Sequence, residues 1–320
     1  MPADLLTETE LKAVASDLAQ SFETARELAT AVPTGRFVSH TSTFYELSTS
    51  EGDAPIALIK VGRDWDLTEA RRIHDDLIAL STLLTDAGSS LEIAQPMGWH
   101  AAPPSLCIAY VPGEDLGKLL RAAGHDTADT FRSVIEACGD ALGSFHSQSP
   151  LADLVPDPTS IRAELEGMAR TLMVQPWFLD AIDLVGSTAR RYGDFAPYNI
   201  RLGPGGKAWI MDQPSPPALD LVHRDVAWFL FNLERRLGSE TSEKGGAFDD
   251  ARAKLADSFH DGYRRTGPVN LDTPADRALL ALYRSHRSLW TVRRRLRQRE
   301  LGEVPAYLRL AMLWRKAARE

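Results

Sequence analysis

The sequence predicts an α+β protein of two lobes: a small N-terminal lobe with an antiparallel sheet plus a helix, and a larger, mainly helical C-terminal lobe. Its 320 residues are long for a single compact unit. Short apolar runs separated by turn residues fill residues 36–62, which is typical of consecutive strands. After residue 116, apolar residues recur at helical spacing. We therefore expect one lobe over residues 1–111 and a second over residues 112–320.

The composition is that of a soluble globular protein, and a net charge of −8 argues against a dedicated nucleic-acid binder. The two cysteines, Cys107 and Cys138, lack CxxC spacing, so we expect neither a disulfide framework nor a zinc site. The sequence shows no signal peptide and no apolar run of the roughly 18 residues that span a membrane. We expect a cytoplasmic protein that binds neither nucleic acid nor membranes. The oligomeric state stays open.

The N-terminal lobe is expected to begin with a helix and to continue as a three-stranded meander. Apolar residues recur at helical spacing over residues 4–31, and Pro33-Thr-Gly35 should end that helix. The strands are expected at residues 36–38, 44–47 and 56–61. A short polar segment that is rich in hydroxyl groups, Ser39-His-Thr-Ser-Thr43, joins the first two strands.

Lys60 is the one charged residue within the apolar third strand. A lysine there either covers the sheet edge with its stem or points into a cleft at an anion. The next helix begins with Asp66 as N-cap and Glu69 at the third position, which resembles a capping box. An acid on this helix would be needed to hold a phosphate-binding Lys60 in place. Glu69 and Asp76 are both candidates, and the sequence does not decide between them.

A hinge between the lobes is expected near residue 112. Short strands at residues 91–96 and 97–100 lead into the apolar run Ser105–Val111, which Pro112-Gly113 ends. Backbone groups that leave a strand need a partner outside it. Those of Tyr110 and Val111 could pair with the edge of an adenine ring.

Most of the remaining chain is expected to be helical. The first stripe runs from Phe131 to His146, and we expect His146 to be packed or capping rather than catalytic. Further helices are expected at residues 163–172, 177–189, 249–264, 274–300 and 304–318, with a surface connection at 238–247. The helix 274–300 is rich in arginine, including Arg287 and Arg294. Its basic side is either solvated or a wall that faces a substrate.

The residues that carry chemistry lie between positions 192 and 212. Asp194 follows a glycine at a tight turn, Asn199 comes five residues later, and a Gly-Pro-Gly-Gly hairpin leads to a strand that ends at Asp212. Taken alone, Asp194 could simply cap a turn and Asp212 could simply end a hairpin, with no catalytic role. Together, a carboxylate that takes the proton of a hydroxyl group and two oxygens that suit Mg²⁺ indicate phosphoryl transfer. Lys60 would then clamp the α- and β-phosphates of a nucleoside triphosphate.

Five segments between residues 36 and 235 follow one another in an order known from one family. They are Tyr110–Leu116, Leu142–His146, Tyr192–Ile200, Ile210–Asp212 and Asp225–Leu230. They resemble the hinge, the L-x-x-L-H helix end, the H-G-D-x-x-x-x-N loop, the I-D metal motif and the D-L-A-x-x-L segment of the aminoglycoside phosphotransferase and choline kinase-like family. The resemblance implies a bilobal protein kinase-like fold, with adenine at the hinge and Mg²⁺ in the cleft.

The resemblance also implies a role for each matching residue. The implied reaction transfers the γ-phosphate of ATP or GTP to a hydroxyl group of a small molecule. Asp194 would be the base, and Asp225 would brace the loop that carries it. The residues implied to bind the nucleotide are Lys60, Glu69, Asp76, Tyr110 and Val111, and those implied to bind Mg²⁺ are Asn199 and Asp212.

Some positions depart from the family pattern. Tyr192 replaces the usual histidine, Gln213 follows the metal acid, and the segment 39–43 has no glycine. A nucleotide- or metabolite-binding pseudokinase without turnover therefore stays open, as does a protein side chain as acceptor. An arginine-rich helix that faces the cleft would favour an anionic acceptor. A cleft lined by Glu234, Glu240 or Asp249 would favour a cationic one.

Overall fold

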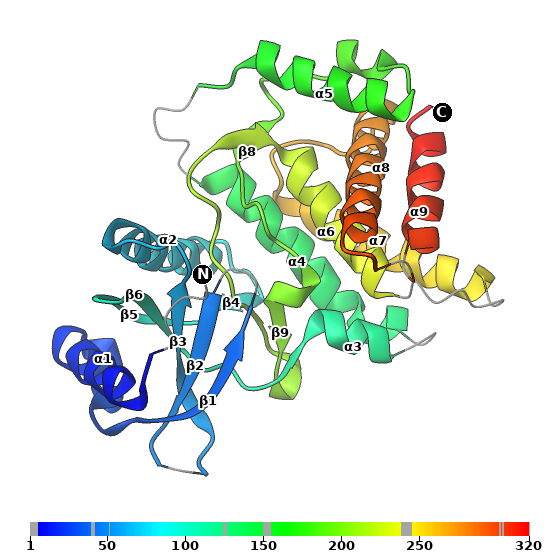
Figure 1. The fold of residues 1–320 in the computed structure, drawn as a ribbon. Helices are drawn as coiled ribbons and strands as arrows, with labels where there is room; N and C mark the ends of the chain where they lie inside the picture. The colour runs from blue at the N-terminus through cyan, green and yellow to red at the C-terminus, as the bar shows by residue number, and fades with distance from the viewer. Residues whose placement is uncertain are drawn as a thin grey trace.

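The computed structural model describes residues 6–39, 42–50, 52–123, 127–149, 155–237, 245–300, 302 and 304–319. As predicted, the fold is α+β, with an antiparallel sheet in the N-terminal part and a mainly helical remainder (Figure 1). The sheet and its two helices lie at the lower left of Figure 1, and the helical part fills the other side. No helix of these residues is both long and apolar enough to cross a membrane.

The start of the chain differs from the single helix that we expected over residues 4–31. Helix α1 (Glu8–Ser21) begins at Thr7, which forms a capping box with Glu10. Phe22 then leaves helical geometry (φ −130°, ψ 126°), and a 3-10 helix, η1 (Glu23–Thr30), follows. Both elements bury apolar residues in the same cluster under the sheet, which explains why they look like one continuous stripe in the sequence.

The first sheet has the strand order β1-β2-β3-β6-β5, and every neighbouring pair is antiparallel. Its strands are β1 (Val32–Val38), β2 (Ser42–Ser48), β3 (Pro55–Gly62), β5 (Pro96–Ala101) and β6 (Pro104–Ala109). The predicted meander is thus confirmed. Strand β1 begins four residues before its expected start, because Pro33 and Gly35 lie at a bulge within the strand rather than beyond a helix.

Strand β3 is apolar along its length because both of its faces are buried. Leu58 packs with helix α2 (Leu67–Asp86) and the helical part, whereas Ala57 and Ile59 pack with α1. Side chains alternate between the two faces of a strand. Lys60 therefore lies on the face of Leu58, toward the C-terminal part of the chain.

A second sheet, of order β4-β10-β9-β7, connects the two parts of the chain. Strand β4 (Leu91–Ile93) runs parallel to β10 (Ala208–Ile210), which forms the predicted hairpin with β9 (Ile200–Leu202). A two-residue strand, β7 (Glu114–Asp115), covers the other edge. Met211 N–H donates to the Asn199 carbonyl at 2.8 Å, so the hairpin holds Asn199 close to the strand end that carries Asp212.

The helical part contains α3 (Leu116–Ala122), α4 (Thr127–Gln148), α5 (Pro158–Leu172), α6 (Val222–Arg236), α7 (Gly245–Thr266), α8 (Pro274–Arg297) and α9 (Val304–Ala317) (Figure 1). The prediction of a helix at residues 177–189 is wrong. Only a 3-10 turn forms, η3 (Trp177–Asp180), before the two-stranded pair of β8 (Thr188–Arg190) and β11 (Leu219–Leu221). Asp183 accepts hydrogen bonds from the N–H groups of Val185 and Gly186, and this local turn competes with a helix.

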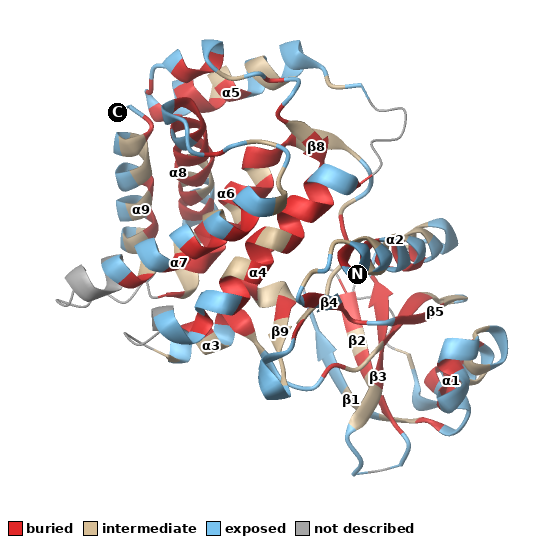
Figure 2. Cartoon of the chain, turned by 180° about the vertical axis from the view of Figure 1, so that it is seen from behind, coloured by how far each residue is buried: buried red, intermediate tan, exposed pale blue. Residues whose placement is uncertain are grey.

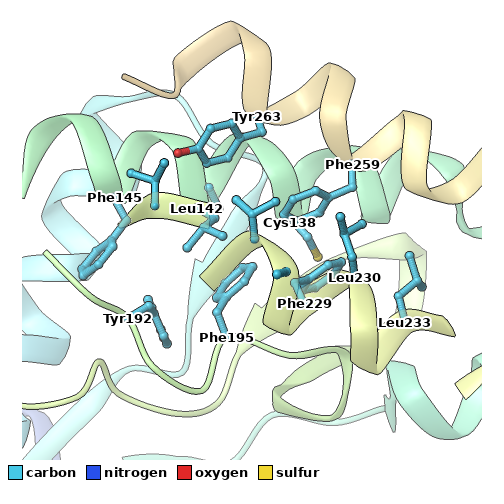
Figure 3. Packing of buried hydrophobic residues seen from close by; sticks show 14 of the residues in the cluster. Cys138, Leu142, Phe145, Tyr192, Phe195, Phe229, Leu230, Leu233, Phe259 and Tyr263 are labelled. Carbon is cyan, nitrogen blue, oxygen red and sulfur yellow. The ribbon is translucent and has the colours of Figure 1, made fainter. Parts of the chain in front are cut away.

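Helices α4 and α7 approach each other backbone to backbone. A Cβ atom added to Gly139 would lie 2.0 Å from the Phe259 carbonyl oxygen, and one added to Gly262 would lie 1.9 Å from that of Glu136. The apolar faces of α4, α6 and α7 are buried in consequence (Figure 2). Figure 3 shows the core that results: Phe145 of α4 packs against Tyr192, Phe229 of α6 packs against Phe195, and Phe259 of α7 stacks on Phe229. The loop that carries Asp194 thus rests on a rigid apolar base.

Candidate active site

The loop around Asp194 connects β8 to a short 3-10 turn, η4 (Pro197–Asn199). At Gly193 the backbone φ is +94°, in the left-handed region that favours glycine. A Cβ atom at this position would also lie 2.0 Å from Ser215 Oγ. Backbone angle and space both require glycine there, and this turn places the next side chain, Asp194, in the wall of a cleft.

Asp225, in the first turn of α6, holds the loop by its main chain. Its carboxylate accepts hydrogen bonds from the N–H groups of Tyr192 (2.6 Å) and Gly193 (2.9 Å). Behind it lies the buried His146, with Nε2 3.3 Å from Asp225 and Nδ1 2.9 Å from the Tyr263 hydroxyl. A neutral imidazole with its proton on Nε2 satisfies both contacts. The geometry fits the bracing role implied for Asp225 and the packed role expected for His146.

Tyr192, which replaces the usual histidine, is a core residue with 1% of its surface exposed. Its ring packs edge-on against Phe145 and Phe195, with centroids 5.1 and 5.0 Å away. Its hydroxyl donates to the main-chain carbonyl of Asp212 at 2.6 Å. Burial raises the pKa of Tyr192 well above its ordinary value, so the hydroxyl stays a donor. The substitution therefore ties the loop to the strand end that carries Asp212.

Asp194 is held by three side chains. Its Oδ1 atom accepts from the Tyr198 hydroxyl and from Trp228 Nε1 (2.9 Å). Asn199 Nδ2 donates to the Asp194 main-chain carbonyl (2.8 Å) and to Oδ2 (3.3 Å). Burial raises the pKa of the Asp194 carboxyl group, and the hydrogen bonds from Tyr198 and Trp228 act in the opposite direction. The result is a fixed, partly desolvated carboxylate.

Lys60 lies across the cleft and is almost completely buried. Its ammonium group is 2.7 Å from Asp212 Oδ1 and 3.0 Å from Gln213 Oε1. The rings of Phe44 and Trp65 lie 5.6 and 5.5 Å from it. The lysine therefore points into the cleft rather than covering the sheet edge. Gln213, a departure from the family pattern, is one of its two hydrogen-bond partners in the described residues.

The two candidate acids of helix α2, Glu69 and Asp76, form a different network from the one expected. Asp66 caps the helix through Glu69 N–H, as predicted, but the Glu69 carboxylate pairs with Arg72 at 2.8 Å. Asp76 pairs with the same arginine and with Arg190 of β8 at 2.7 Å. Arginine three or four residues away on a helix reaches such acids easily. Within the described residues neither acid is bonded to Lys60, and Asp76 instead ties α2 to the C-terminal part.

At the hinge, two of the backbone groups that we considered for adenine are already used. Tyr110 N–H donates to the Ile56 carbonyl and the Val111 carbonyl accepts from Arg201, both at 2.8 Å. The guanidinium of Arg201 also lies 5.4 Å from the centre of the Tyr110 ring. The described part of the chain supplies no hydrogen-bond partner for the Val111 N–H or the Tyr110 carbonyl. These two groups are the ones left for a ligand.

Two cavities meet at Asp194. The first, of about 720 Å³, is lined by Lys60, Asn199 and Asp212, with Ser39 and Ser42 on the strand side. Residues 40 and 41 of the hydroxyl-rich segment lie outside the described residues. The second cavity, of about 550 Å³, is lined by α5, α6 and α8 and contains none of those five residues. The residues common to both walls are Asp194, Trp228, Arg287 and Trp290.

Solved structures of similar fold are kinases and phosphotransferases. A proposed aminoglycoside phosphotransferase from Ralstonia eutropha aligns with a TM-score of 0.60 at 12% identity, over 96% of this chain and 95% of its own. Amicoumacin kinase with AMP-PNP and Ca²⁺ gives 0.56 at 12% identity, over 93% of each chain. Glucosamine kinase with glucosamine and ADP gives 0.56 at 17% identity, over 97% of this chain and 83% of its own.

The chain has the protein kinase-like fold of these enzymes. No protein-family model matches it, and no curated protein sequence does. The likeness is therefore one of fold at low sequence identity, and it agrees with the family resemblance of the five motifs.

Three residues of the site were missed by the sequence reasoning. Tyr198 lies inside the loop motif, at a position that the motif leaves free, and Trp228 lies likewise inside the Asp225–Leu230 segment. The hydroxyl group of Tyr198 and the indole N–H of Trp228 are hydrogen-bond donors inside motifs that should lie near Asp194. This was the signal in the sequence that could have identified them. Arg287 was considered only as part of a basic helix face, and its place beside Asp194 depends on how α8 packs against α6.

Proposed function

We propose that the protein is a phosphotransferase that moves the γ-phosphate of ATP or GTP, with Mg²⁺, to a hydroxyl group of a small molecule, with Asp194 as the base. The observation that carries this proposal is the position of Asp194 between two cavities. Only the first cavity contains Lys60, Asn199 and Asp212, which suit a nucleotide and its metal. The second offers space for an acceptor on the other side of the same carboxylate. Similar folds in complexes with AMP-PNP or ADP support the use of a nucleotide.

The residues proposed to hold Mg²⁺ fit this ion chemically. Asn199 and Asp212 supply an amide oxygen and a carboxylate, which are hard oxygen ligands in one cavity wall. The described residues contain no group of three or more histidine, cysteine or acidic side chains that could hold a metal ion. Phosphates and waters would complete the shell, as Mg²⁺ prefers. When bound, the ion would neutralise charge on the phosphates, and Lys60 could leave Asp212 for them.

Asp194 would orient the acceptor hydroxyl and take its proton. The acceptor oxygen forms a bond to the γ-phosphorus while the bond from that phosphorus to the β,γ-bridging oxygen breaks. The proton passes to the Asp194 carboxylate, and the nucleoside diphosphate leaves with the electron pair. The raised pKa of Asp194 makes its carboxylate a stronger base than an exposed aspartate. At the hinge, the Val111 N–H and the Tyr110 carbonyl would meet the base of the nucleotide.

The proposal is tested with Asp194→Asn, which keeps an oxygen for the Tyr198 and Trp228 donors. Nucleoside diphosphate release would be measured with a panel of hydroxyl compounds, and nucleotide binding by the rise in Tm with AMP-PNP and Mg²⁺. We expect turnover to fall by about 10²–10⁴-fold while the rise in Tm remains, since that is the usual contribution of a general base. Asp180→Asn, at an exposed aspartate of the same part of the chain, should change neither.

Other results would change the assignment in specific ways. Unchanged turnover in Asp194→Asn would show that Asp194 is not the base. Stabilisation by nucleotide without turnover of any compound would favour a nucleotide-binding pseudokinase. Transfer of label from ATP to a large molecule in cell lysate would point to a protein acceptor.

A further inference from the structure

Four arginines line the first cavity on the side of helices α6 and α8. Arg235 and Arg236 end α6, and Arg287 and Arg294 lie two turns apart on α8. We call these four residues the arginine cluster. In the described part of the chain none of them has a carboxylate oxygen within 4.0 Å, the limit for an ion pair.

The positive charge of this cavity is not balanced by its acids. Seven lysines and arginines line it against three aspartates, counted over the described residues. The whole protein, by contrast, carries a net charge of −8. Like charges that line one cavity repel each other, and an anion bound among them would remove that repulsion. The local excess thus indicates an anionic ligand.

Arg287 is the best-placed member of the arginine cluster. Its guanidinium carbon lies 3.9 Å from the centre of the Trp228 ring and 4.4 Å from that of Trp290. Stacking of this kind fixes the planar group and uses none of its N–H donors. The Nε atom is buried without a hydrogen-bond partner in the described residues. Trp228 in turn donates to Asp194, so one side chain separates the guanidinium from the proposed base.

The second donor to Asp194 has the same arrangement. Tyr198 donates its hydroxyl to Asp194, and the guanidinium of Arg236 lies 5.5 Å from the centre of its ring. Burial lowers the pKa of Arg236 and of Arg287, and neighbouring arginines lower both further. The side chains that hold the proposed base therefore also contact two arginines whose charge is disfavoured by burial and by neighbouring arginines and favoured by Tyr198.

Glu234, one of the acids that would favour a cationic acceptor, lies away from the two cavities. Glu234 is buried, pairs with Arg284 and accepts from Trp314 Nε1 at 3.1 Å. It lines neither of the two cavities. Glu240 and the side chain of Asp249 lie outside the described residues. The arginine-rich helix, in contrast, faces the cleft.

We propose that Arg287, the member of the arginine cluster that also borders the second cavity, is a subsite for a carboxylate or phosphate group of the acceptor. This inference rests on the proposed function. Of the four arginines only Arg287 also lines the second cavity, together with Asp194, so an anion that its guanidinium holds there belongs to the molecule that presents its hydroxyl group to Asp194. The fork of N–H donors in a guanidinium matches both kinds of anion. The protein would thus phosphorylate an anionic small molecule.

The subsite is tested first by sulfate binding to the full chain saturated with AMP-PNP and Mg²⁺. Sulfate replaces chloride at constant ionic strength, and Tm is recorded; because sulfate stabilises proteins generally, only a saturable rise counts. Arg287→Met should abolish that rise and Arg294→Met should weaken it. Arg297→Met, at an exposed residue of the same helix that lines neither cavity, should keep it. Displacement of AMP-PNP by sulfate, or a saturable rise that survives in Arg287→Met, would overturn the proposal.

Matched acceptors then test the chemistry. Glucuronate, glucose and glucosamine form one series, and glycerate, glycerol and 1-amino-2,3-propanediol another; phosphorylated analogues separate phosphate from carboxylate. We expect kcat/KM to be highest for anionic members. Arg287→Met should lower the ratio of anionic to neutral kcat/KM about 10- to 100-fold, the effect of losing charge-assisted hydrogen bonds. Arg297→Met should keep the ratio.

Each pattern of failure has its own meaning. An equal loss for all acceptors in Arg287→Met would place the arginine on the transferred phosphoryl group and overturn the subsite. A preference of the wild type for neutral or cationic acceptors would overturn it too. The proposed function fails in a different way, with no stabilisation by AMP-PNP and Mg²⁺ and no turnover in any class.

Discussion

Removal of the Tyr192 hydroxyl tests whether the loop that carries Asp194, the proposed base, and the strand end at Asp212 act as one unit. Tyr192→Phe keeps the ring that packs on Phe145 and Phe195 and deletes only the donor to the Asp212 carbonyl. The partly buried Asp212 carbonyl then lacks its partner, which costs at most about 1–3 kcal/mol of stability, the range for a fully buried group. The strand end that carries the Asp212 carboxylate also loses a support, and loss of an outer partner of a metal ligand lowers metal affinity about 10- to 100-fold.

Two measurements check this prediction. Urea unfolding gives the change in the free energy of unfolding, and a Mg²⁺ titration of the AMP-PNP-induced rise in Tm gives the metal requirement. Tyr45→Phe is the matched control, because Tyr45 is 3% exposed and its hydroxyl accepts from Leu6 N–H at 2.9 Å, within the cluster that faces α1. It should lose similar stability at an unchanged Mg²⁺ requirement. An unaltered free energy of unfolding in Tyr192→Phe, or the same rise in Mg²⁺ requirement in both variants, would refute the reasoning.

Two further predictions concern the base and the helix packing. Tyr198→Phe removes a hydrogen bond that lowers the pKa of Asp194, so this pKa should rise. The acid limb of the kcat/KM profile, over which the proposed base becomes protonated, should therefore move to higher pH. An unmoved limb would argue against Asp194 as base. Gly262→Ala should destabilise the protein by about 1–3 kcal/mol, since its Cβ atom would overlap the α4 backbone. Gly167→Ala, in α5, should stabilise the protein by about 0.5–1 kcal/mol, because the atom nearest to the added Cβ atom is 3.8 Å away. Urea unfolding would contradict this prediction if both variants changed the free energy of unfolding in the same direction.

Features that depend on local sequence were predictable from the sequence. The meander, the hairpin before Asp212 and the turn at Gly193 follow from strand periodicity and turn residues within short windows. The prediction of a helix at 177–189 failed because the hydrogen bonds that the Asp183 carboxylate accepts from the N–H groups of Val185 and Gly186 outweigh helix propensity there. The pairing of β4 with β10 joins residues more than a hundred positions apart, and no local pattern encodes it.

In the candidate site, too, some features follow from local sequence and others depend on long-range packing. The positions of Asp194, Asn199 and Asp212 within the chain indicated their neighbourhood. The partner of Lys60 did not follow from the chain order, because Arg72 and Arg190 compete for the acids of α2. Which arginine of α8 enters the cleft depends on the rotation of that helix against α6, which packing sets.

Strand β4 also sets how the cleft can open. It belongs to the segment between α2 and β5, yet its main chain is bonded to β10, and Ala94 N–H continues the pairing to the Ile210 carbonyl at 3.1 Å. Ladder hydrogen bonds resist separation more than they resist twist. A motion of the N-terminal sheet against the helical part that kept this pairing would rotate about the β4–β10 line. The rim near Ser39 and Ser42 would then travel further than the end of the hairpin that carries Asp212, the proposed metal ligand.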